Sequence, residues 1–565
     1  MSRLQSMLDE LKRRRVFRVG AVYAVVAFII WQVAEIAFPA LQLPEWALTL
    51  VVVLTIVGFP VAVVLAWAFD ITPEGVKRTG PEGAAAERAD VPPRLESEPV
   101  RKSIVVLPFD NMSPDPQDAY LSDGLTEEII TGLSCCGPLR VISRNSARVL
   151  KGTEKDTRTL ARELDVQYVL EGSVRKAGND LRITAQLIDG GTDAHLWSER
   201  YSGTLEDVFD MQERLSCSIV DALMLKLSPE EGRRLTGRPI DNAQAYECYL
   251  RARQEIWVFT KDSLDRARQH IQNGLEIIGE NALLLAGMGY VYFQYANLGL
   301  ADEEYFEKAE EYARKALQLD PESAEAHIVL GLTNMILRGD LKKGVYHLKQ
   351  ALARKPDDPH ALHWLRTMYI HAGRVDEAYP LAERLARVDP LTPISAWGTA
   401  PVDVFAGRSD VASEEVTKWF RLEPQNPGAL MLCALFLAYC SRYDEARELI
   451  RGNLQADNED FATRMTLLLE GALDGDASRF QEIVTEDFEK WARRDLEFSY
   501  FLAGIHALAG LKEEALDWLS NAVDRGFINY PFIAEHDPLL ESIRGDPRFQ
   551  DIAARAKHEW EHFDA

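Results

Sequence analysis

The amino-acid sequence predicts a multidomain chain: an α-helical transmembrane hairpin, an α/β domain and an all-α solenoid. Two long apolar runs near the start predict the hairpin, and a middle segment of alternating strand and helix patterns predicts the α/β domain. Small residues that recur every 34 positions in the second half predict stacked helix pairs. The predicted parts are a basic N-terminus (residues 1–18), the hairpin (19–70), a flexible linker (71–102), the α/β domain (103–228), a second linker (229–241), the solenoid (242–550) and a C-terminal tail (551–565).

Composition excludes several classes of function. The chain has 565 residues, too many for one core, and a formal net charge of -25, which argues against nucleic acid as a partner because phosphate contacts require a basic face. Its six cysteines show no disulfide framework and no paired zinc spacing, so we expect a reducing compartment. Packing beside a turn is the favoured role for the adjacent Cys135 and Cys136. We predict no metal and no cofactor.

Residues 19–38 and 46–69 are each long and apolar enough to span a bilayer. Basic residues precede the first run and follow the second, whereas the connecting residues 39–45 contain no Lys or Arg. By the positive-inside rule both termini are cytoplasmic, and residues 19–70 contact lipid. Glu35 lies near the outer interface, where a structural role is favoured over an ion path. The small pair Ala62 and Ala66 leaves homo-oligomerisation open.

The linker is rich in Pro, Gly and Ala and cannot bury a core. Beyond it, residues 103–109 form a wholly apolar run that is typical of a strand buried on both faces. Residues 181–188 alternate apolar and polar side chains, which indicates a half-solvated sheet. The remaining expected strands are 139–143, 168–175 and 194–201, and the expected helices are 121–133, 157–164 and 205–227.

Five ordered blocks of this segment resemble TolB amino-terminal-like domains of bacteria. They are SIVVLPFDNMS (103–113), LSDGLTEEII (121–130), YVLEGSVRK (168–176), LRITAQLID (181–189) and AHLWSERY (194–201). The resemblance implies a domain that commonly lies between tetratricopeptide repeats and a signalling output, either a class III nucleotide cyclase or a winged-helix DNA-binding domain. Only about eighteen residues precede the first apolar run, too few for either output. Neither activity is therefore carried over, and the resemblance supplies no catalytic residue.

The sequence contains no phosphate-binding loop, no GxGxxG turn, no HExxH pair and no GxSxG elbow. Two weaker enzymatic candidates remain. The acidic residues Asp110, Asp115, Asp118 and Asp123 could gather a divalent cation, although a solvated turn-forming loop is favoured. Ser134 or Cys135 could pair with His195 as nucleophile and base, but nothing in the sequence brings them together. We predict no catalytic residues.

Three columns of residues define the repeats. The small column packs the paired helices, the turn column adopts the left-handed conformation, and a proline ends each unit. The columns are Ala309, Gly344, Ala378, Ala412 and Ala446; Gly339, Gly373, Gly407 and Ser441; and Pro356, Pro390 and Pro424. This pattern resembles tetratricopeptide repeats (TPRs), which bind proteins far more often than they catalyse reactions. Pro401 falls inside an expected first helix and should bend it.

First-helix positions predict the inner wall of the solenoid. The predicted wall residues are Ile328, Leu332, Met335, His363, Thr367, Ile370, Trp397, Val404, Met431 and Leu435. The wall is largely apolar, so an apolar helix or extended segment of a cytoplasmic protein is the expected ligand. For about half of these side chains, packing against neighbouring repeats is an equally good interpretation. Residues 526–549 resemble the closing segment of related repeat proteins and should seal the end of the stack.

We predict a non-enzymatic adaptor, anchored in the bacterial inner membrane, that recruits cytoplasmic proteins through the TPR wall. The alternative is a sensory component whose TolB-like domain binds a ligand and signals to a separately encoded cyclase or transcription regulator. An enzyme that uses the acidic loop is a third class, and we expect no metal-dependent turnover from it.

Overall fold

The computed structural model describes residues 69–72, 75–78, 101–153, 155–256, 260–412, 415–455 and 460–564. The chain divides into two compact units, Met1–Pro93 and Arg94–Ala565. In the first unit, strands β1 (Phe69–Thr72) and β2 (Gly75–Arg78) pair antiparallel. This small hairpin lies where the sequence predicts the start of the flexible linker.

The two predicted membrane-spanning runs, residues 19–38 and 46–69, lie outside the described residues apart from Phe69 at the start of β1. No helix within the described ranges is both long and apolar enough to span a bilayer. The transmembrane hairpin and its lipid contact therefore stay predictions.

The second unit begins with a six-stranded sheet in the order β5-β3-β6-β7-β8, with β4 also paired to β6. Strand β3 is parallel to β5 and β6, whereas β6, β7 and β8 form an antiparallel meander. The strands are β3 (Lys102–Val106), β4 (Asp110–Asn111), β5 (Leu139–Val141), β6 (Tyr168–Ala177), β7 (Asp180–Asp189) and β8 (Ala194–Thr204). The predicted strands are confirmed, and the short β4 is an addition.

Helices cover one face of the sheet fully and the other face in part. Ile183 and Ala185 of β7 are buried on the first face, whereas Arg182 is exposed and Thr184 half-buried on the other, as the alternation predicts. The second face is covered at one end by α6, whose Leu160 packs with Val105. The helices of this domain are α4 (Ala119–Ser134), α5 (Arg144–Val149), α6 (Thr157–Glu163), α7 (Val208–Ala222) and α8 (Pro229–Leu235), with short 3-10 turns η1 (Pro116–Asp118) and η2 (Leu205–Asp207). Strand β3 is buried on both faces, as its apolar run predicts.

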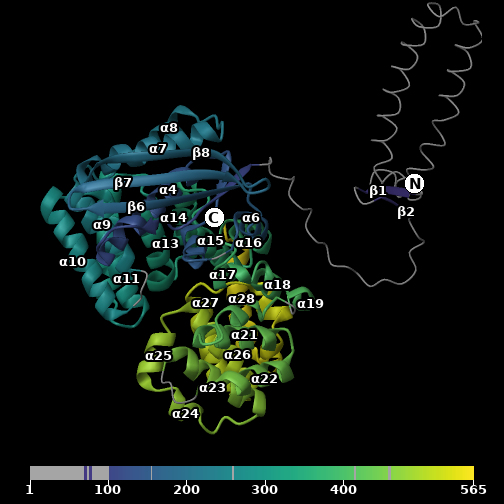
Figure 1. The fold of residues 1–565 in the computed structure, drawn as a ribbon. Coiled ribbons are helices and arrows are strands. Elements are labelled where there is room, and N and C mark those ends of the chain that lie inside the picture. The colour runs from purple at the N-terminus through teal and green to yellow at the C-terminus, as the bar shows by residue number, and fades with distance from the viewer. Residues whose placement is uncertain are drawn as a thin grey trace, which may run out of the picture. The chain divides into compact units, whose positions relative to one another are not determined.

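Helix pairs follow the sheet without interruption, and Figure 1 shows the sheet at one end of the unit and α21 to α27 at the other. The pairs are α9 (Ala243–Ile256) with α10 (Lys261–Ile278), α11 (Ala282–Asn297) with α12 (Glu304–Leu319), α13 (Ala324–Arg338) with α14 (Leu341–Arg354), α15 (Pro359–His371) with α16 (Val375–Val388), α17 (Pro393–Ala396) and α18 (Ala400–Phe405) with α19 (Ser409–Ala412) and α20 (Lys418–Leu422), α21 (Pro427–Tyr439) with α22 (Tyr443–Asn453), α23 (Phe461–Asp474) with α24 (Phe480–Ile483) and α25 (Glu486–Ala492), and α26 (Leu496–Leu508) with α27 (Lys512–Asp524). Successive pairs pack side by side, which is the architecture of a solenoid.

The repeat columns have the conformations that the sequence predicts. Every residue of the small column is buried. The turn column has positive φ throughout, at +63°, +67° and +75° for the three glycines and +59° for Ser441. The left-handed turn between paired helices is therefore repeated every 34 residues, and Ser441 adopts it despite its side chain.

At Pro401 the structure shows a break where the sequence predicts a bend. Helix α17 ends at Ala396 and α18 starts at Ala400, with Gly398 between them at φ +54°. The ring of a proline clashes with the carbonyl four residues earlier, here that of Trp397, so one continuous helix cannot form. The second helix of the same unit is also divided, into α19 and α20.

The segment that follows α27 packs on α26 and also reaches back along the solenoid. It contains a π-helical turn η3 (Phe532–His536), a 3-10 helix η4 (Pro538–Ile543) and helix α28 (Pro547–Glu561). The ring of Phe527 stacks on Tyr500 of α26 at 3.8 Å between centroids, while Phe532 lies 4.7 Å from Phe405 of α18. Helix α28 occupies most of the predicted C-terminal tail, and α8 lies inside the predicted linker 229–241.

Candidate functional site

The α/β domain is joined to the solenoid through the loop that links α16 to α17. The Ser143 amide donates to the Val388 carbonyl at 2.6 Å, and the Arg140 guanidinium donates to the Arg387 carbonyl at 3.0 Å. Both acceptors belong to the turn that ends one repeat. The two domains therefore meet through specific backbone contacts.

Asp389 is the centre of this contact. Its carboxylate accepts hydrogen bonds from the hydroxyls of Ser143 and Ser146 in the α/β domain, the latter at 2.8 Å. It also accepts from Thr392 and Ser395 of its own loop. Burial raises the pKa of Asp389, and the surrounding hydroxyls partly oppose that shift. A buried carboxylate with four donors is costly to expose and hard to replace.

A cavity of about 170 Å³ lies beside this contact. Residues from α4, β5 and the start of α5 form its wall on one side, and residues from α9, α11, α13 and the start of α15 form the other. One water needs only roughly 10–15 Å³ of such space, so the cavity can hold a small molecule. It adjoins a wider cleft that shares Thr131, Arg253 and Lys355 with it and provides a route from outside.

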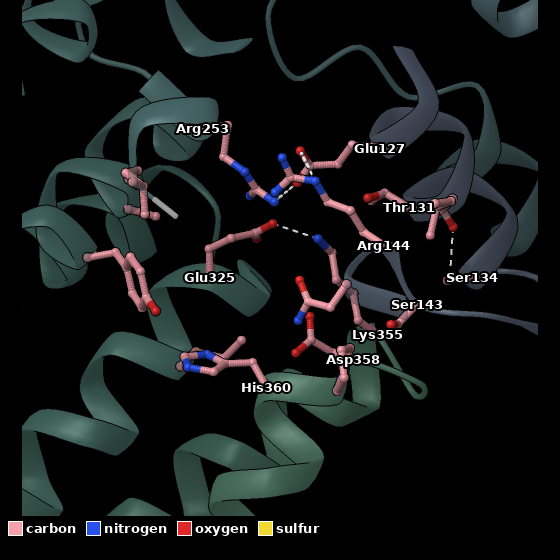
Figure 2. Close-up of a pocket in the computed structure, with 18 of the residues that line it drawn as sticks. Glu127, Thr131, Ser134, Ser143, Arg144, Arg253, Glu325, Lys355, Asp358 and His360 are labelled. Carbon is pink, nitrogen blue, oxygen red and sulfur yellow. Dashed lines mark hydrogen bonds and ion pairs between the residues drawn. The ribbon is translucent and has the colours of Figure 1, made fainter. Parts of the chain in front are cut away.

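Charged side chains from both domains face each other in the cavity (Figure 2). Glu127 of α4 pairs with Arg144 at 3.0 Å and with Arg253 of α9, so one carboxylate joins the two domains. Glu325 of α13 pairs with Lys355 at 2.6 Å. Arg144, Arg253, Glu325 and Lys355 lie at or near helix ends, whereas Glu127 lies in the middle of α4.

Burial disfavours the charged form of Glu325, but Lys355 and Arg253 outweigh it and lower its pKa to about 2. Burial also lowers the pKa of Arg144, to about 10. Both groups therefore remain charged at neutral pH. Asp358 closes the set: one of its oxygens accepts the Ala361 amide at 2.9 Å and caps α15.

Nine of the ten predicted wall residues are buried, and each of the nine is at most 8% exposed. His363 is half-buried. Neighbouring repeats account for part of this burial: the Trp397 ring lies 4.7 Å from Trp419 and 4.9 Å from Phe436. The interpretation that these side chains pack against neighbouring repeats therefore fits the structure, and contact with a partner stays a prediction. Of the ten, Ile328 lines the cavity.

The C-terminal segment covers the turns of successive repeats. Asn529 donates to the Ile370 carbonyl at 3.0 Å and to the Phe405 carbonyl at 3.2 Å. A Cβ on Gly373 would lie 2.9 Å from the Trp560 indole nitrogen, and a Cβ on Gly339 would lie 2.7 Å from the Arg525 carbonyl oxygen. Glycine is thus required at these turns for two reasons: its φ is positive, and any side chain would clash with the C-terminal segment.

The enzymatic candidates are not assembled into a site. Asp118 pairs with Lys176 and Asp123 with Lys151, while Asp115 caps a 3-10 turn. Within the described ranges, no three His, Cys, Asp or Glu side chains are grouped so as to hold a metal ion. The Ser134 hydroxyl donates to the carbonyl of Ile130, and His195 is exposed on β8, with no contact to Ser134 or Cys135 in that part of the structure.

The charged cavity was not predicted from the sequence. Its members come from segments as distant in the sequence as Glu127 and Asp358, and periodicity carries no information on contacts between domains. One local signal exists: Lys355 and Asp358 lie in the proline-flanked turn between two repeats, where charged residues are ordinary surface groups. Only the docked α/β domain turns that loop into the wall of a cavity.

Family models match two parts of the chain. Residues 100–218 match the second domain of HilA/YgeH-like transcriptional regulators, and residues 300–359 and 335–397 match tetratricopeptide repeats. The chain thus contains TPR repeats, which suggest a protein-interaction scaffold. The predicted resemblance of residues 103–228 to TolB amino-terminal-like domains stays a prediction.

Two curated relatives are similar over part of their length. Putative adenylate cyclase 3 of Rhizobium meliloti (strain 1021) is 41% identical over 253 residues, 44% of this chain and 43% of the relative. Transcriptional regulator HilA of Salmonella typhimurium is 23% identical over 372 residues, 63% of each chain. The chain therefore spans less than two thirds of the length of these relatives.

Two solved structures of repeat proteins are also similar to this chain. The TPR protein TTC0263 of Thermus thermophilus is 17% identical, with a TM-score of 0.28, and the match covers 34% of this chain and 99% of that one. The type IV pilus biogenesis factor PilW is 18% identical, with a TM-score of 0.30, and the match covers 44% of this chain and 98% of that one.

Proposed function

We propose that this protein is a non-enzymatic adaptor, anchored in the bacterial inner membrane through residues 19–70, that recruits cytoplasmic proteins to its TPR solenoid. The observation that carries the proposal is the uninterrupted stack of helix pairs from α9 to α27, an architecture used mainly for binding proteins. Anchoring would itself be part of the mechanism, because tethering raises the effective concentration of a bound partner near a membrane target.

The anchoring is tested with the full chain in a bacterial host. The chain should sediment with membranes and resist alkaline extraction, and protease added to intact spheroplasts should leave residues 101–564 undigested. Digestion of this part before lysis would contradict the proposed orientation. Release of the chain by alkali would contradict the anchor.

The recruitment is tested by crosslinking and affinity purification of the full chain from detergent extracts. Trp397 and Met431 are buried, so substitutions there would disturb the fold. Asn529 is buried too, but Asn529→Ala acts at one place, because it removes two hydrogen bonds that hold the C-terminal segment against the repeats. Asn453→Ala is the control, since that exposed side chain donates to the local Leu449 carbonyl.

If the partner binds the repeat turns that the C-terminal segment covers, Asn529→Ala should increase partner recovery relative to Asn453→Ala. Equal recovery with both variants would place the partner on another surface. Failure to enrich any protein over an unrelated membrane protein of the same tag would contradict the adaptor.

A second candidate function is favoured by the cavity. Its walls come from the α/β domain and from the repeats, so a ligand there would contact both and could change how they are joined. We therefore propose as an alternative a sensory component that signals to a separately encoded cyclase or transcription regulator. The names of the two curated relatives support this choice of output. The test is whether purified cyclase or regulator candidates respond to the full chain only when a ligand occupies the cavity.

A further inference from the structure

The charges that line the cavity balance. Three cations, Arg144, Arg253 and Lys355, line it, and so do four carboxylates. One carboxylate, Asp357, pairs with Arg384 at 2.6 Å, outside the lining. The remaining three, Glu127, Glu325 and Asp358, match the three cations in number. The empty space is therefore surrounded by a neutral set of charges.

This balance selects the charge of a ligand. An anion or a cation alone would add an uncompensated charge to a partly desolvated space, and breaking one buried pair to accommodate it is strongly unfavourable. A neutral apolar molecule would exclude water from the unused donors of Lys355 and the second oxygen of Asp358 without replacing it. A molecule that carries one positive and one negative group adds no net charge and can bond to both kinds of side chain.

Two lining groups keep bonding capacity for such a molecule. The Lys355 ammonium has three N–H donors, and Glu325 accepts one of them at 2.6 Å. Asp358 uses one oxygen to cap α15, and no donor in the described part of the chain bonds its other oxygen. Among these described residues no ion pair joins Lys355 to Asp358, although both line the space and carry opposite charges. In Figure 2 they lie on neighbouring parts of the wall, with His360 close to Asp358.

Part of the remaining lining is aliphatic, beside the rings of Tyr249 and Tyr290 and several Ser, Thr and Asn side chains. Ile130 and Val141 come from the α/β domain, and Ile256, Leu283 and Ile328 come from the repeats. A ligand with a branched aliphatic side chain would bury it there at about 25 cal/mol for each Å² removed from water.

We propose that this cavity binds a small aliphatic α-amino acid, with its carboxylate on Lys355 and its ammonium on Asp358. The inference deepens the sensory alternative, because it names the class of ligand at the same site, and it does not depend on membrane anchoring. Binding would fix the α/β domain against the first repeats through groups from both.

The test is calorimetry and thermal unfolding of the purified full chain with L-leucine as the probe. Two analogues each lack one charge: 4-methylpentanoate has no ammonium, and 3-methylbutylamine has no carboxylate. L-Leucine should bind saturably and raise the unfolding temperature, and each analogue should bind at least roughly tenfold more weakly.

Asp358→Asn is the decisive variant, because asparagine still caps the helix but carries no charge. It should weaken L-leucine binding roughly tenfold or more. Asp340→Asn is the matched control, since Asp340 caps α14 in the same way and does not line the cavity, and it should bind L-leucine as the wild type does.

The proposal is overturned if L-leucine does not bind saturably, if either analogue binds as well as L-leucine, or if Asp358→Asn binds L-leucine as tightly as Asp340→Asn does. Partner recovery in the crosslinking experiment is independent of these outcomes. If L-leucine does not bind but partners are still recruited, the proposed ligand is wrong and the proposed adaptor function stands.

Discussion

A glycine-to-alanine pair offers a direct test of the contact between the C-terminal segment and the repeats. Gly339 and Gly475 both end a first helix in the left-handed conformation, at φ/ψ of 63°/18° and 71°/22°. A Cβ on Gly475 meets nothing within 4 Å, whereas one on Gly339 would lie 2.7 Å from the Arg525 carbonyl oxygen. The two substitutions thus differ in one respect, the clash with a distant backbone segment.

The expected magnitudes follow from that difference. Alanine in the left-handed region costs about 1–2 kcal/mol at either position. At Gly339 the backbone around Arg525 must also move, and overpacking of this kind costs a further ~1–3 kcal/mol. The loss of unfolded-state entropy on replacing glycine is the same for both and cancels. Gly339→Ala should therefore be less stable than Gly475→Ala by about 1–3 kcal/mol.

The assay is urea unfolding of the two variants followed by tryptophan fluorescence, together with hydrogen exchange of the Ile528 amide. That amide donates to the His371 carbonyl at 2.9 Å, so it reports on whether the segment stays in place. Gly339→Ala should shift the midpoint to lower urea and speed Ile528 exchange relative to Gly475→Ala. Equal midpoints and equal exchange would refute the close packing of this segment on the turn.

Three further substitutions test buried polar groups. Asp389→Ala should destabilise the contact between the α/β domain and the solenoid by ~2–4 kcal/mol, because the buried Ser143 and Ser146 hydroxyls lose their acceptor. Limited proteolysis measures this loss, since the variant should be cleaved between the domains earlier than the wild type. Burial raises the pKa of Asp537 to about 6, so this group contributes stability below about pH 4 that is lost as the pH rises through 6. Urea unfolding at pH 4.5 and 7.5 should show Asp537→Asn gaining roughly 2 kcal/mol on the wild type between the two pH values. Arg366→Met should raise the free energy of unfolding by ~1–3 kcal/mol. The reason is that Arg366 is fully buried and, among the described residues, its Nε and one Nη have no acceptor. Lower stability of this variant in urea would contradict that account.

The two aspartate substitutions have matched comparisons in the chain. Asp460→Ala also removes an aspartate at a helix end, but far from the domain contact. Protease should therefore cut this variant between the two domains no earlier than it cuts the wild type. Asp156→Asn changes an exposed cap and should show no gain between the two pH values of the Asp537 experiment. A wild-type dependence on pH that persists in Asp537→Asn would mean that other carboxyls cause it.

The local patterns of the chain predicted much of the fold. The turn column predicted left-handed φ at Gly339 and its equivalents because only that conformation lets two helices pack across so short a turn. The apolar run at residues 103–109 and the alternation at residues 181–188 predicted a central and a half-solvated strand for the same reason: side-chain period reports burial.

Contacts between distant segments could not be predicted in this way. The break at Trp397 to Thr399 depends on where Pro401 falls in the unit, and its local signal indicated only a bend. The cavity requires Glu127 to meet Arg253, and no spacing in the sequence encodes that meeting. The apolar wall was predicted correctly as apolar, but the same residues also serve as the packing surface between repeats.

The order of synthesis gives the C-terminal segment a special role in folding. Residues 525–563 are translated after all the repeats, yet Arg374 binds the carbonyls of Trp560 and Phe563, and the Ile528 amide binds the His371 carbonyl. Until these residues leave the ribosome, the repeat turns that they cover stay open and the apolar side chains beside those turns face water. A nascent chain of this protein should therefore need a chaperone for longer than a solenoid whose repeats contact only their immediate neighbours.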